Sequence, residues 1–534
     1  MRRRWMCLLL LIPLVELPAH AELRLPAVIS DYAMMQGGKP IQVWGWATPN
    51  VRIQVDFLGP GSTVLTNFKA IADPGGRWHG TLGAMRDGTT GSLRITTDAH
   101  EQKIVQKILI GEVWLASGQS NMVYPIAPGP NDGFLNKSDP EEMAQVRQNT
   151  ARAMAQADAT KPPIRFFIVA DSKLDRPADD VNGSWVVANS TNIAKVSAVA
   201  WNFAVTIEDR VHLPVGLIQS CISGSPVEAW ISKTTLESTS IGAAVEQRHA
   251  EALAATPEAM ERFNADTAAW IAANPSPELQ RLNQATKPKQ LWSTAWWQTA
   301  NSFYNGMIAG LEPYTLRGII WYQADGNSHH PMEYSELFQA LIKEWRAEWR
   351  DQLPIYFVEM NNMNEDKQSL PVQPNALSLI REQQHGGLAL PGVGMVAAID
   401  LGIKNPHFPN KRPVGQRLAG LALRDCYGIP GEVNSPLFKS ASFEEDKVRL
   451  SFSDAQGLRV RGGGEVRGFA IRGSSGDWVW ADGKVEGETV IVWSSQVAHP
   501  TAVRYAWAQN PVISIENSAG LPLYPFRTDR ASKE

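Results

Sequence analysis

The order of apolar and polar residues divides the chain into three parts. In the first part, up to about residue 107, short runs rich in Val, Ile, Trp and Thr alternate with polar residues, as at 41–46, 51–55 and 93–97. This period-two pattern, with no helical stretch between the runs, predicts antiparallel strands. We therefore expect an N-terminal β-sandwich over residues 22–108 that forms a separate lobe.

After Gly111 the pattern changes to apolar strands that alternate with helical segments. The predicted strands cover residues 113–116, 164–169, 215–220, 318–323, 354–359 and 394–400. The clearest predicted helices cover residues 197–211, 334–349 and 414–426. Such alternation predicts an α/β domain with a parallel, doubly wound sheet, in which ligands bind beyond the carboxyl ends of the strands. We place this α/β domain at residues 109–431.

Two further segments complete the predicted organisation. An Ala- and Glu-rich helical stretch with several prolines interrupts the α/β domain at about residues 241–289. It forms either a lid or rim over a site or a passive surface hairpin. From about residue 432 the strand pattern returns between glycine-containing turns, which predicts a C-terminal β module over residues 432–534.

The first 21 residues have the pattern of a secretory signal peptide. Three arginines at 2–4 precede an apolar run at 8–15, and Ala19-His20-Ala21 is a small-x-small cleavage site. The apolar run is too short to span a bilayer. We therefore expect an exported protein, either periplasmic or secreted, without a membrane span.

Composition excludes several classes of function. The chain has 534 residues, a hydrophobic fraction of 44% and a net charge of -4, which indicates a soluble protein of several domains and gives no electrostatic basis for binding nucleic acid. Beyond the signal peptide only Cys221 and Cys426 remain, too few for a disulfide scaffold or a metal cluster. They are buried hydrophobic residues or form a single bridge. The 19 tryptophans belong to the core or stack on sugars.

Ser120 is the candidate nucleophile because it follows an apolar strand directly, in a turn of small polar residues. The turn is not the Gly-x-Ser-x-Gly elbow of α/β-hydrolases, since Met122 replaces the second glycine. A serine hydroxyl needs a base, and His407 follows the last predicted strand of the same domain. At the same edge of the sheet, its imidazole would serve as general base and then as general acid.

An acyl-transfer site also needs donors for the oxyanion. Gly224 follows the third strand and Asn327 the fourth, so a backbone N–H and a side-chain amide are available, with the N–H of Ser120 as a third donor. Gly224 and Asn327 are equally compatible with plain turn residues.

Two other interpretations of the acidic residues and histidines stay open. Asp325 with His329 and His330 suggests a metal site, although no wider ligand spacing supports one. Asp325 with Glu228 suggests a glycosidase carboxylate pair.

These blocks together resemble the sialate O-acetylesterase family within the SGNH (GDSL-like) hydrolases, over almost the whole mature chain. The matching blocks are residues 111–122, 228–230, 304–308, 318–323, 414–419, 503–507 and 525–529. The resemblance implies a serine esterase that removes acetyl groups from sugar hydroxyls without a cofactor or metal. It assigns Ser120 and His407 as nucleophile and base, and Gly224 and Asn327 as oxyanion donors. Gln119, Glu228 and Gln323 lie in the same blocks as possible supporting residues.

Three departures from the family pattern are visible. Ala324 and Asp325 stand where the family has Gly and Glu, and Ser223 replaces the first of two glycines before Gly224. In SGNH enzymes an Asp lies two or three residues before the histidine. Here those positions hold Asn405 and Lys404. Either a Ser-His dyad operates, or another acid such as Asp400 reaches the histidine.

The sequence thus predicts an exported sialate O-acetylesterase that works through an acyl-enzyme. One alternative is an acetylesterase for acetylated xylan or another polysaccharide, which needs the same residues. An alternative of another class is a glycan-binding protein without activity. The expected partner is an O-acetylated sugar or glycan, and the sequence does not indicate an oligomeric state.

Overall fold

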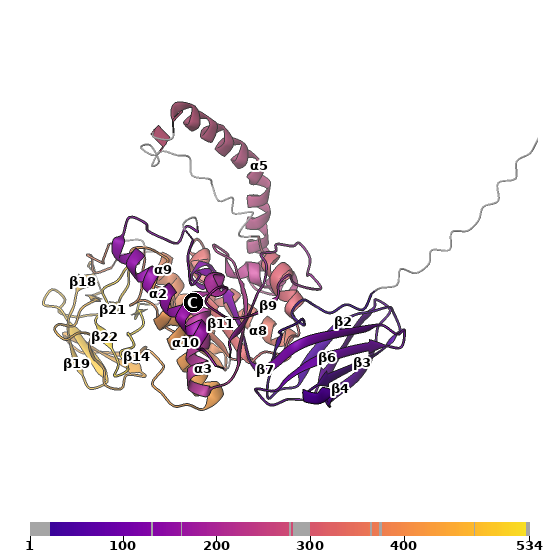
Figure 1. The fold of residues 1–534 in the computed structure, drawn as a ribbon. Coiled ribbons are helices and arrows are strands. Elements are labelled where there is room, and N and C mark those ends of the chain that lie inside the picture. The colour runs from indigo at the N-terminus through magenta and orange to yellow at the C-terminus, as the bar shows by residue number, and fades with distance from the viewer. Residues whose placement is uncertain are drawn as a thin grey trace, which may run out of the picture.

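The computed structural model describes residues 22–129, 132–161, 163–276, 279–280, 299–363, 366–372, 376–474 and 476–529. The predicted signal peptide and the last part of the predicted insertion lie outside the described residues. A central α/β domain lies between a β-rich N-terminal unit and a β-rich C-terminal unit (Figure 1). In the described residues no helix is long and apolar enough to cross a membrane.

The central domain is built on a mixed sheet. Its strands, in spatial order, are β13 (Val393–Val396), β12 (Ile355–Val358), β11 (Gly318–Tyr322), β7 (Gln102–Gly118), β10 (Val215–Cys221), β8 (Arg165–Ile168) and β9 (Trp185–Val187). The first six are parallel, and β9 is antiparallel to β8. Every predicted strand of the α/β domain is present, although most are shorter than predicted because the chain turns at the carboxyl edge before the apolar run ends.

Alternating side chains of the strands divide the interior into two cores. Val113 and Leu115 of β7 point into one core, whereas Trp114 and Ala116 point into the other. The second core is covered by α2 (Pro140–Ala159), α3 (Ala198–Val211) and α10 (Arg412–Tyr427). Helices α8 (Tyr334–Glu348) and α9 (Ala376–Gln384) pack into the first core. A parallel sheet buried on both faces explains why its strands are continuous apolar runs.

The N-terminal unit is continuous with the central sheet through β7. Its strands are β1 (Met34–Gln36), β2 (Ile41–Trp46), β3 (Arg52–Leu58), β4 (Val64–Ile71), β5 (Arg77–Leu82) and β6 (Thr90–Thr97). The first half of β7 pairs with β6, and its second half pairs with β10 and β11. The boundary predicted at residue 108 therefore falls inside a strand, and side chains of the N-terminal unit share the first core with α8. This differs from the separate lobe that the sequence suggested.

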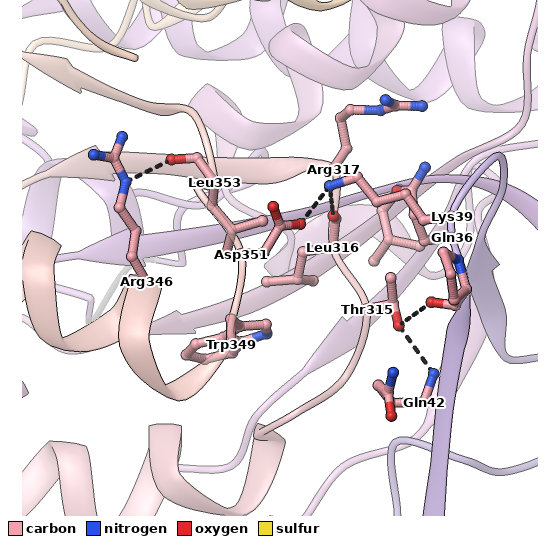
Figure 2. A network of polar contacts seen from close by, with 12 residues as sticks. Gln36, Lys39, Gln42, Thr315, Leu316, Arg317, Arg346, Trp349, Asp351 and Leu353 are labelled. Carbon is pink, nitrogen blue, oxygen red and sulfur yellow. Dashed lines mark hydrogen bonds and ion pairs between the residues drawn. The ribbon is translucent and has the colours of Figure 1, made fainter. Parts of the chain in front are cut away.

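Polar contacts fix the N-terminal unit against the amino edge of the sheet. Lys39 donates from Nζ to the Leu316 carbonyl at 3.0 Å and to Oδ2 of Asp351 at 2.7 Å (Figure 2). Nearby, the backbone N–H of Gln42 donates to Oγ1 of Thr315 at 3.1 Å. These contacts attach the N-terminal unit to the segments that lead into β11 and β12.

The C-terminal unit has a hydrophobic core of its own. Strands β14 (Leu437–Phe443), β15 (Lys447–Ser453), β20 (Thr489–Trp493) and β19 (Asp482–Glu486) form one antiparallel sheet. Strands β18 (Val479–Trp480), β17 (Phe469–Arg472), β21 (Ala502–Tyr505) and β23 (Phe526–Arg527) form the other, and β16 (Arg459–Val460) pairs with β22 (Ile515–Glu516). Arg381 of α9 attaches this unit by donating to the carbonyls of Ala508 at 2.8 Å and Gln509 at 2.9 Å.

The predicted insertion begins as one long helix, α5 (Gly242–Ala273), which follows the short α4 (Lys233–Glu237). Most of α5 projects away from the body of the molecule (Figure 1). Its first turns are attached, because Val245 is fully buried and Arg248 forms a double hydrogen bond with Glu333 at 2.9 and 2.6 Å. Cys221 and Cys426 are both free, so the alternative of a bridge between them is not realised.

Candidate active site

Three loops that carry candidate residues begin at the same level of the sheet. Gly118, the last residue of β7, pairs with Cys221 at the end of β10 on one side and with Tyr322 at the end of β11 on the other. Gly118 has φ +132, and a Cβ on it would lie 2.2 Å from the Tyr322 carbonyl oxygen. Only glycine fits this close approach. The loops with Ser120, Gly224 and Asn327 thus emerge side by side at the carboxyl edge.

Ser120 begins the short helix α1 (Ser120–Val123), directly after this turn. Ser120 is 7% exposed. The first N–H groups of a helix have no partner within the helix, and the N–H of Ser120 has none in the part of the chain that the structure describes. The turn therefore offers a hydroxyl and an available backbone donor at one residue.

Gln119 ties the serine turn to the loop after β11. Its Oε1 accepts hydrogen bonds from the N–H groups of Ala324 at 3.2 Å and Gly326 at 3.1 Å, and its Nε2 donates to Asp325. Burial raises the pKa of Asp325, and the bond from Gln119 opposes that rise. The two residues that depart from the family pattern, Ala324 and Asp325, are thus held by Gln119. Asp325 is committed to this contact, and within the described ranges no group of three or more His, Cys, Asp or Glu side chains could hold a metal ion.

Asn327 lies in a 3-10 turn, η7 (Asp325–Asn327), and is 5% exposed. Its Oδ1 accepts from the N–H of Val227 and from Nε2 of Gln323, both at 2.9 Å. Its Nδ2 donates to Oε2 of Glu228 at 2.6 Å. An amide has two acceptor positions and two N–H donors. Three of these four positions are occupied, which leaves one N–H of Asn327 without a partner among the described residues.

Gly224 lies in the loop after β10 with φ +75, and a Cβ on it would meet nothing within 4 Å. The loop around it is fixed, because the Ser225 hydroxyl donates to the Ile222 carbonyl at 2.8 Å and accepts from Nε1 of Trp230 at 2.9 Å. The backbone N–H of Gly224 has no hydrogen-bond partner in the described residues. It is an open donor on a rigid loop.

His407 lies in the loop between β13 and α10, next to the serine turn. Nδ2 of Asn121, the residue after Ser120, donates to the carbonyl of Pro406, the residue before His407, at 3.3 Å. The His407 ring packs edge-on against Phe134 with ring centres 5.0 Å apart. Burial, and to a smaller extent the charge of Lys411, lowers the pKa of His407 to about 4. The imidazole is therefore neutral at pH 7. Among the described residues, no hydrogen bond joins the His407 imidazole to the Ser120 hydroxyl.

No carboxylate is bonded to the His407 ring within the described residues. Asn405, at the position of the family's aspartate, turns its amide toward α2: Nδ2 donates to the Phe134 carbonyl at 2.9 Å and to Oε1 of Glu142 at 2.7 Å. Its Oδ1 accepts the backbone N–H of His407 at 2.9 Å. Asp400 instead forms an ion pair with Arg417 at 2.7 Å and with Arg461 at 3.1 Å. Lys404 pairs with Asp366 at the surface.

Lys411 is a residue of this region that sequence reasoning missed. It is 1% exposed, it donates to Oδ1 of Asn121, and its Nζ lies 3.7 Å from the ring centre of Phe408 and 5.0 Å from that of Tyr124. Burial lowers its pKa well below the usual value for lysine. A lysine between polar loop residues looks like a surface residue, so only its position four residues after His407 could have drawn attention to it.

The carboxyl edge of the sheet thus presents a serine hydroxyl and a neutral imidazole in the neighbouring loop. It also presents three N–H groups without partners in the described chain: the backbone N–H of Ser120, that of Gly224, and one side-chain N–H of Asn327. These are the groups that acyl transfer through a serine requires. Glu228, Gln323 and Gln119 surround them as hydrogen-bonding supports.

Comparison with known proteins identifies a related group. A family model described as carbohydrate esterase, sialic acid-specific acetylesterase, matches residues 286–424, a range that contains Asn327 and His407. The crystal structure of a carbohydrate acetylesterase from Xanthomonas citri is similar at a TM-score of 0.74 and 30% sequence identity, over 95% of this chain and 100% of that one.

Curated relatives carry the name sialate O-acetylesterase. The protein from Mus musculus is 25% identical over 63% of this chain and 58% of its own length. The protein from Homo sapiens is 24% identical over 57% of this chain and 49% of its own length. The chain therefore spans about half to three-fifths of the curated relatives that it matches.

Proposed function

The chain belongs to the sialate O-acetylesterase family of carbohydrate esterases, and on that premise we propose that it is a serine esterase that hydrolyses O-acetyl groups on sugars. Support comes first from the groups at the carboxyl edge of the sheet. The observation that carries most weight is the hydrogen bond from Asn121 to Pro406, because it links the direct neighbours of Ser120 and His407.

In the proposed reaction, Oγ of Ser120 attacks the acetyl carbonyl carbon while the His407 imidazole takes the hydroxyl proton. The carbonyl oxygen becomes an oxyanion, which accepts hydrogen bonds from the N–H groups of Ser120 and Gly224 and from Nδ2 of Asn327. The imidazolium then protonates the sugar oxygen, the ester bond breaks and the sugar leaves. A water molecule attacks the acetyl-serine through the same base, and acetate is released.

We propose that Ser120 and His407 act as a dyad. A neutral imidazole can accept a proton without a carboxylate behind it, and the lowered pKa of His407 keeps it neutral across the physiological range. Asp400 is engaged by Arg417 and Arg461, which argues against it as the missing acid. An imidazolium without an ionic partner is less stable, so we expect the dyad to be slower than a full triad.

Sialic acid is the proposed sugar because the family model and the curated relatives carry that substrate in their names. The name of the similar Xanthomonas citri structure, carbohydrate acetylesterase, supports a second candidate, another acetylated glycan such as xylan. Acetate release should be measured from O-acetylated sialic acid beside acetylated xylo-oligosaccharides at equal acetyl concentration. The substrate with the higher kcat/KM is the preferred class.

The finer organisation is also part of the proposal. We infer that residues 109–431 form an SGNH-type catalytic domain. Residues 22–108 would be a β-sandwich module that shares strand β7 and the first core with it, and residues 432–534 a second β-sandwich module. The segment 1–21 would direct export to the periplasm or beyond the cell.

The decisive test of the activity is Ser120→Ala with an aryl acetate as substrate. We expect at least about a thousandfold loss of kcat, because the nucleophile is removed while the fold is kept. Circular dichroism and the melting temperature control for folding. Turnover retained in a folded Ser120→Ala protein would refute the serine mechanism. Glycan binding without hydrolysis by the unmodified protein would support the non-catalytic alternative.

A further inference from the structure

The root of the projecting helix α5 reaches the proposed oxyanion site. Nε2 of His249, in the second turn of α5, lies 3.7 Å from Oε1 of Glu228, whose other oxygen accepts the hydrogen bond of Asn327. We propose that His249 is a positioning residue for the oxyanion hole, acting on Asn327 through Glu228. This inference rests on the proposed esterase function, and it assigns a role in catalysis to a helix outside the α/β fold.

Glu228 holds the NH₂ side of the Asn327 amide. Because Oδ1 of Asn327 accepts from Val227 and Gln323, its NH₂ group must point to the opposite side, where Glu228 takes one N–H at 2.6 Å. The second side-chain N–H of Asn327 then points in a single fixed direction. If the Glu228 carboxylate turned away, the bonds to Oδ1 would remain but the NH₂ side of the amide would lose its only hydrogen bond within the described chain, so the donor would be held less firmly for the oxyanion.

His249 is the side chain that faces the free oxygen of Glu228. The Glu228 side chain is 10% exposed and that of His249 is 18% exposed, so little water competes for this carboxylate. A carboxylate buried to this degree is stable when both oxygens have polar partners. Asn327 serves Oε2, and the imidazole is the group placed to serve Oε1.

The position of His249 is fixed by the body of the protein. Val245 is buried in the core one turn earlier, and Arg248 is held by Glu333 in the segment that follows η7. The part of α5 beyond His249 leaves the surface (Figure 1). The first turns of α5 are therefore a rigid part of the wall behind Asn327.

The test replaces His249 by Leu, which removes both ring nitrogens, and by Gln, which keeps a polar donor. With an aryl acetate we expect His249→Leu to lower kcat about tenfold with KM within about twofold, since the contact acts on the transition state. His249→Gln should retain activity to within about threefold. Affinity for a boronic acid, which forms a tetrahedral anion on the Ser120 oxygen, should fall with kcat/KM in His249→Leu.

A double-mutant cycle separates positioning from simple attachment of α5. If His249 acts through Glu228, then Glu228→Gln and the double variant His249→Leu/Glu228→Gln should have equal kcat to within about twofold. The matched control is Arg248→Met, which loosens the same helical turn through Glu333 without touching Glu228. We expect it to lose clearly less kcat than His249→Leu, because buried Val245 still anchors the turn and the imidazole is still present.

Three results would overturn the inference: wild-type kcat in folded His249→Leu, additive effects in the cycle, or a loss in Arg248→Met equal to that in His249→Leu. Each of them leaves the proposed function intact as long as Ser120→Ala is inactive. If instead Ser120→Ala is fully active, the serine mechanism itself fails, so the two failures are distinguishable.

Discussion

Nζ of Lys411 donates a hydrogen bond to Oδ1 of Asn121, the residue directly after the proposed nucleophile Ser120. Asn121 in turn donates to the carbonyl before His407, so one lysine and one asparagine hold the serine turn and the histidine loop together. In a Ser-His-Asp triad the charge beside the histidine is negative and stabilises the imidazolium. Here the nearby charged group is a lysine, which together with burial favours the neutral imidazole.

Replacing Lys411 by Met should move the acidic limb of kcat/KM to higher pH. The pKa of His407 is lowered to about 4 by burial and, as the smaller cause, by Lys411, so the unmodified protein keeps its base until the pH falls toward that value. Removing the positive charge raises the pKa of His407, so the acidic limb moves to higher pH. Profiles of kcat/KM between pH 4 and 8 measure this shift. Lys404→Met, at an exposed lysine of the same loop, is the control, and equal shifts in both variants would contradict the prediction.

Restoring the family's acid by Asn405→Asp should reduce stability and give no gain in kcat. The Asn405 amide donates to the Phe134 carbonyl and to Glu142, and a carboxylate there would lose both bonds and face Glu142 at close range. We expect the free energy of unfolding to fall by about 1–3 kcal/mol. Adding Glu142→Gln should recover part of it. A higher kcat in Asn405→Asp would mean that an acid at this position does reach His407.

Asp400→Asn should destabilise the protein while leaving the pH profile unchanged. The Asp400 side chain is fully buried between Arg417 and Arg461, and neutralising it leaves the largely buried guanidinium of Arg417 without its carboxylate partner. Loss of one partner of a buried pair costs about 3 kcal/mol, measurable by urea unfolding. If the acidic limb of kcat/KM moved in this variant, Asp400 would be the third member of a triad after all.

Glu312→Gln should stabilise the protein at alkaline pH. Burial, and then the charges of Glu348 and Glu344, raise the pKa of Glu312 from 4.5 to about 9. In that interval the folded protein keeps a proton that the unfolded chain releases, so stability is full below about pH 4.5 and is lost as the pH rises toward 9. Glutamine cannot lose this proton. The difference in melting temperature, variant minus unmodified protein, should therefore grow between pH 5 and 9, whereas Glu251→Gln on exposed α5 should show no such growth.

The sequence predicted the central sheet well and some helices poorly, for a physical reason. Buried parallel strands are continuous apolar runs that are visible without any partner. Helix α2 buries few of its side chains, so its apolar period is faint. Its cap was the better signal, because the Asp139 side chain accepts from the N–H groups of Glu141 and Glu142, with a proline at the first helical position.

The candidate site was only partly visible for a related reason. Ser120, Gly224, Asn327 and His407 follow strands, and the strand-end rule collects such residues at one edge. The roles of Asn405, Lys411 and His249 depend instead on partners far away in sequence, such as Glu142 and Glu228. Only the folded chain brings these partners together.

Strand β7 runs from the N-terminal sheet into the central sheet with one bulge at Gln106 and Lys107, and this limits how the segment can change in evolution. Successive side chains of a strand point to opposite faces. Deleting a single residue between Ile108 and Val113, beyond the bulge, would exchange the side chains that face the two sides of the sheet, and would leave Ser120 one step out of place. Natural variation in this stretch should consist of substitutions, with gains or losses of length confined to the loops beyond it.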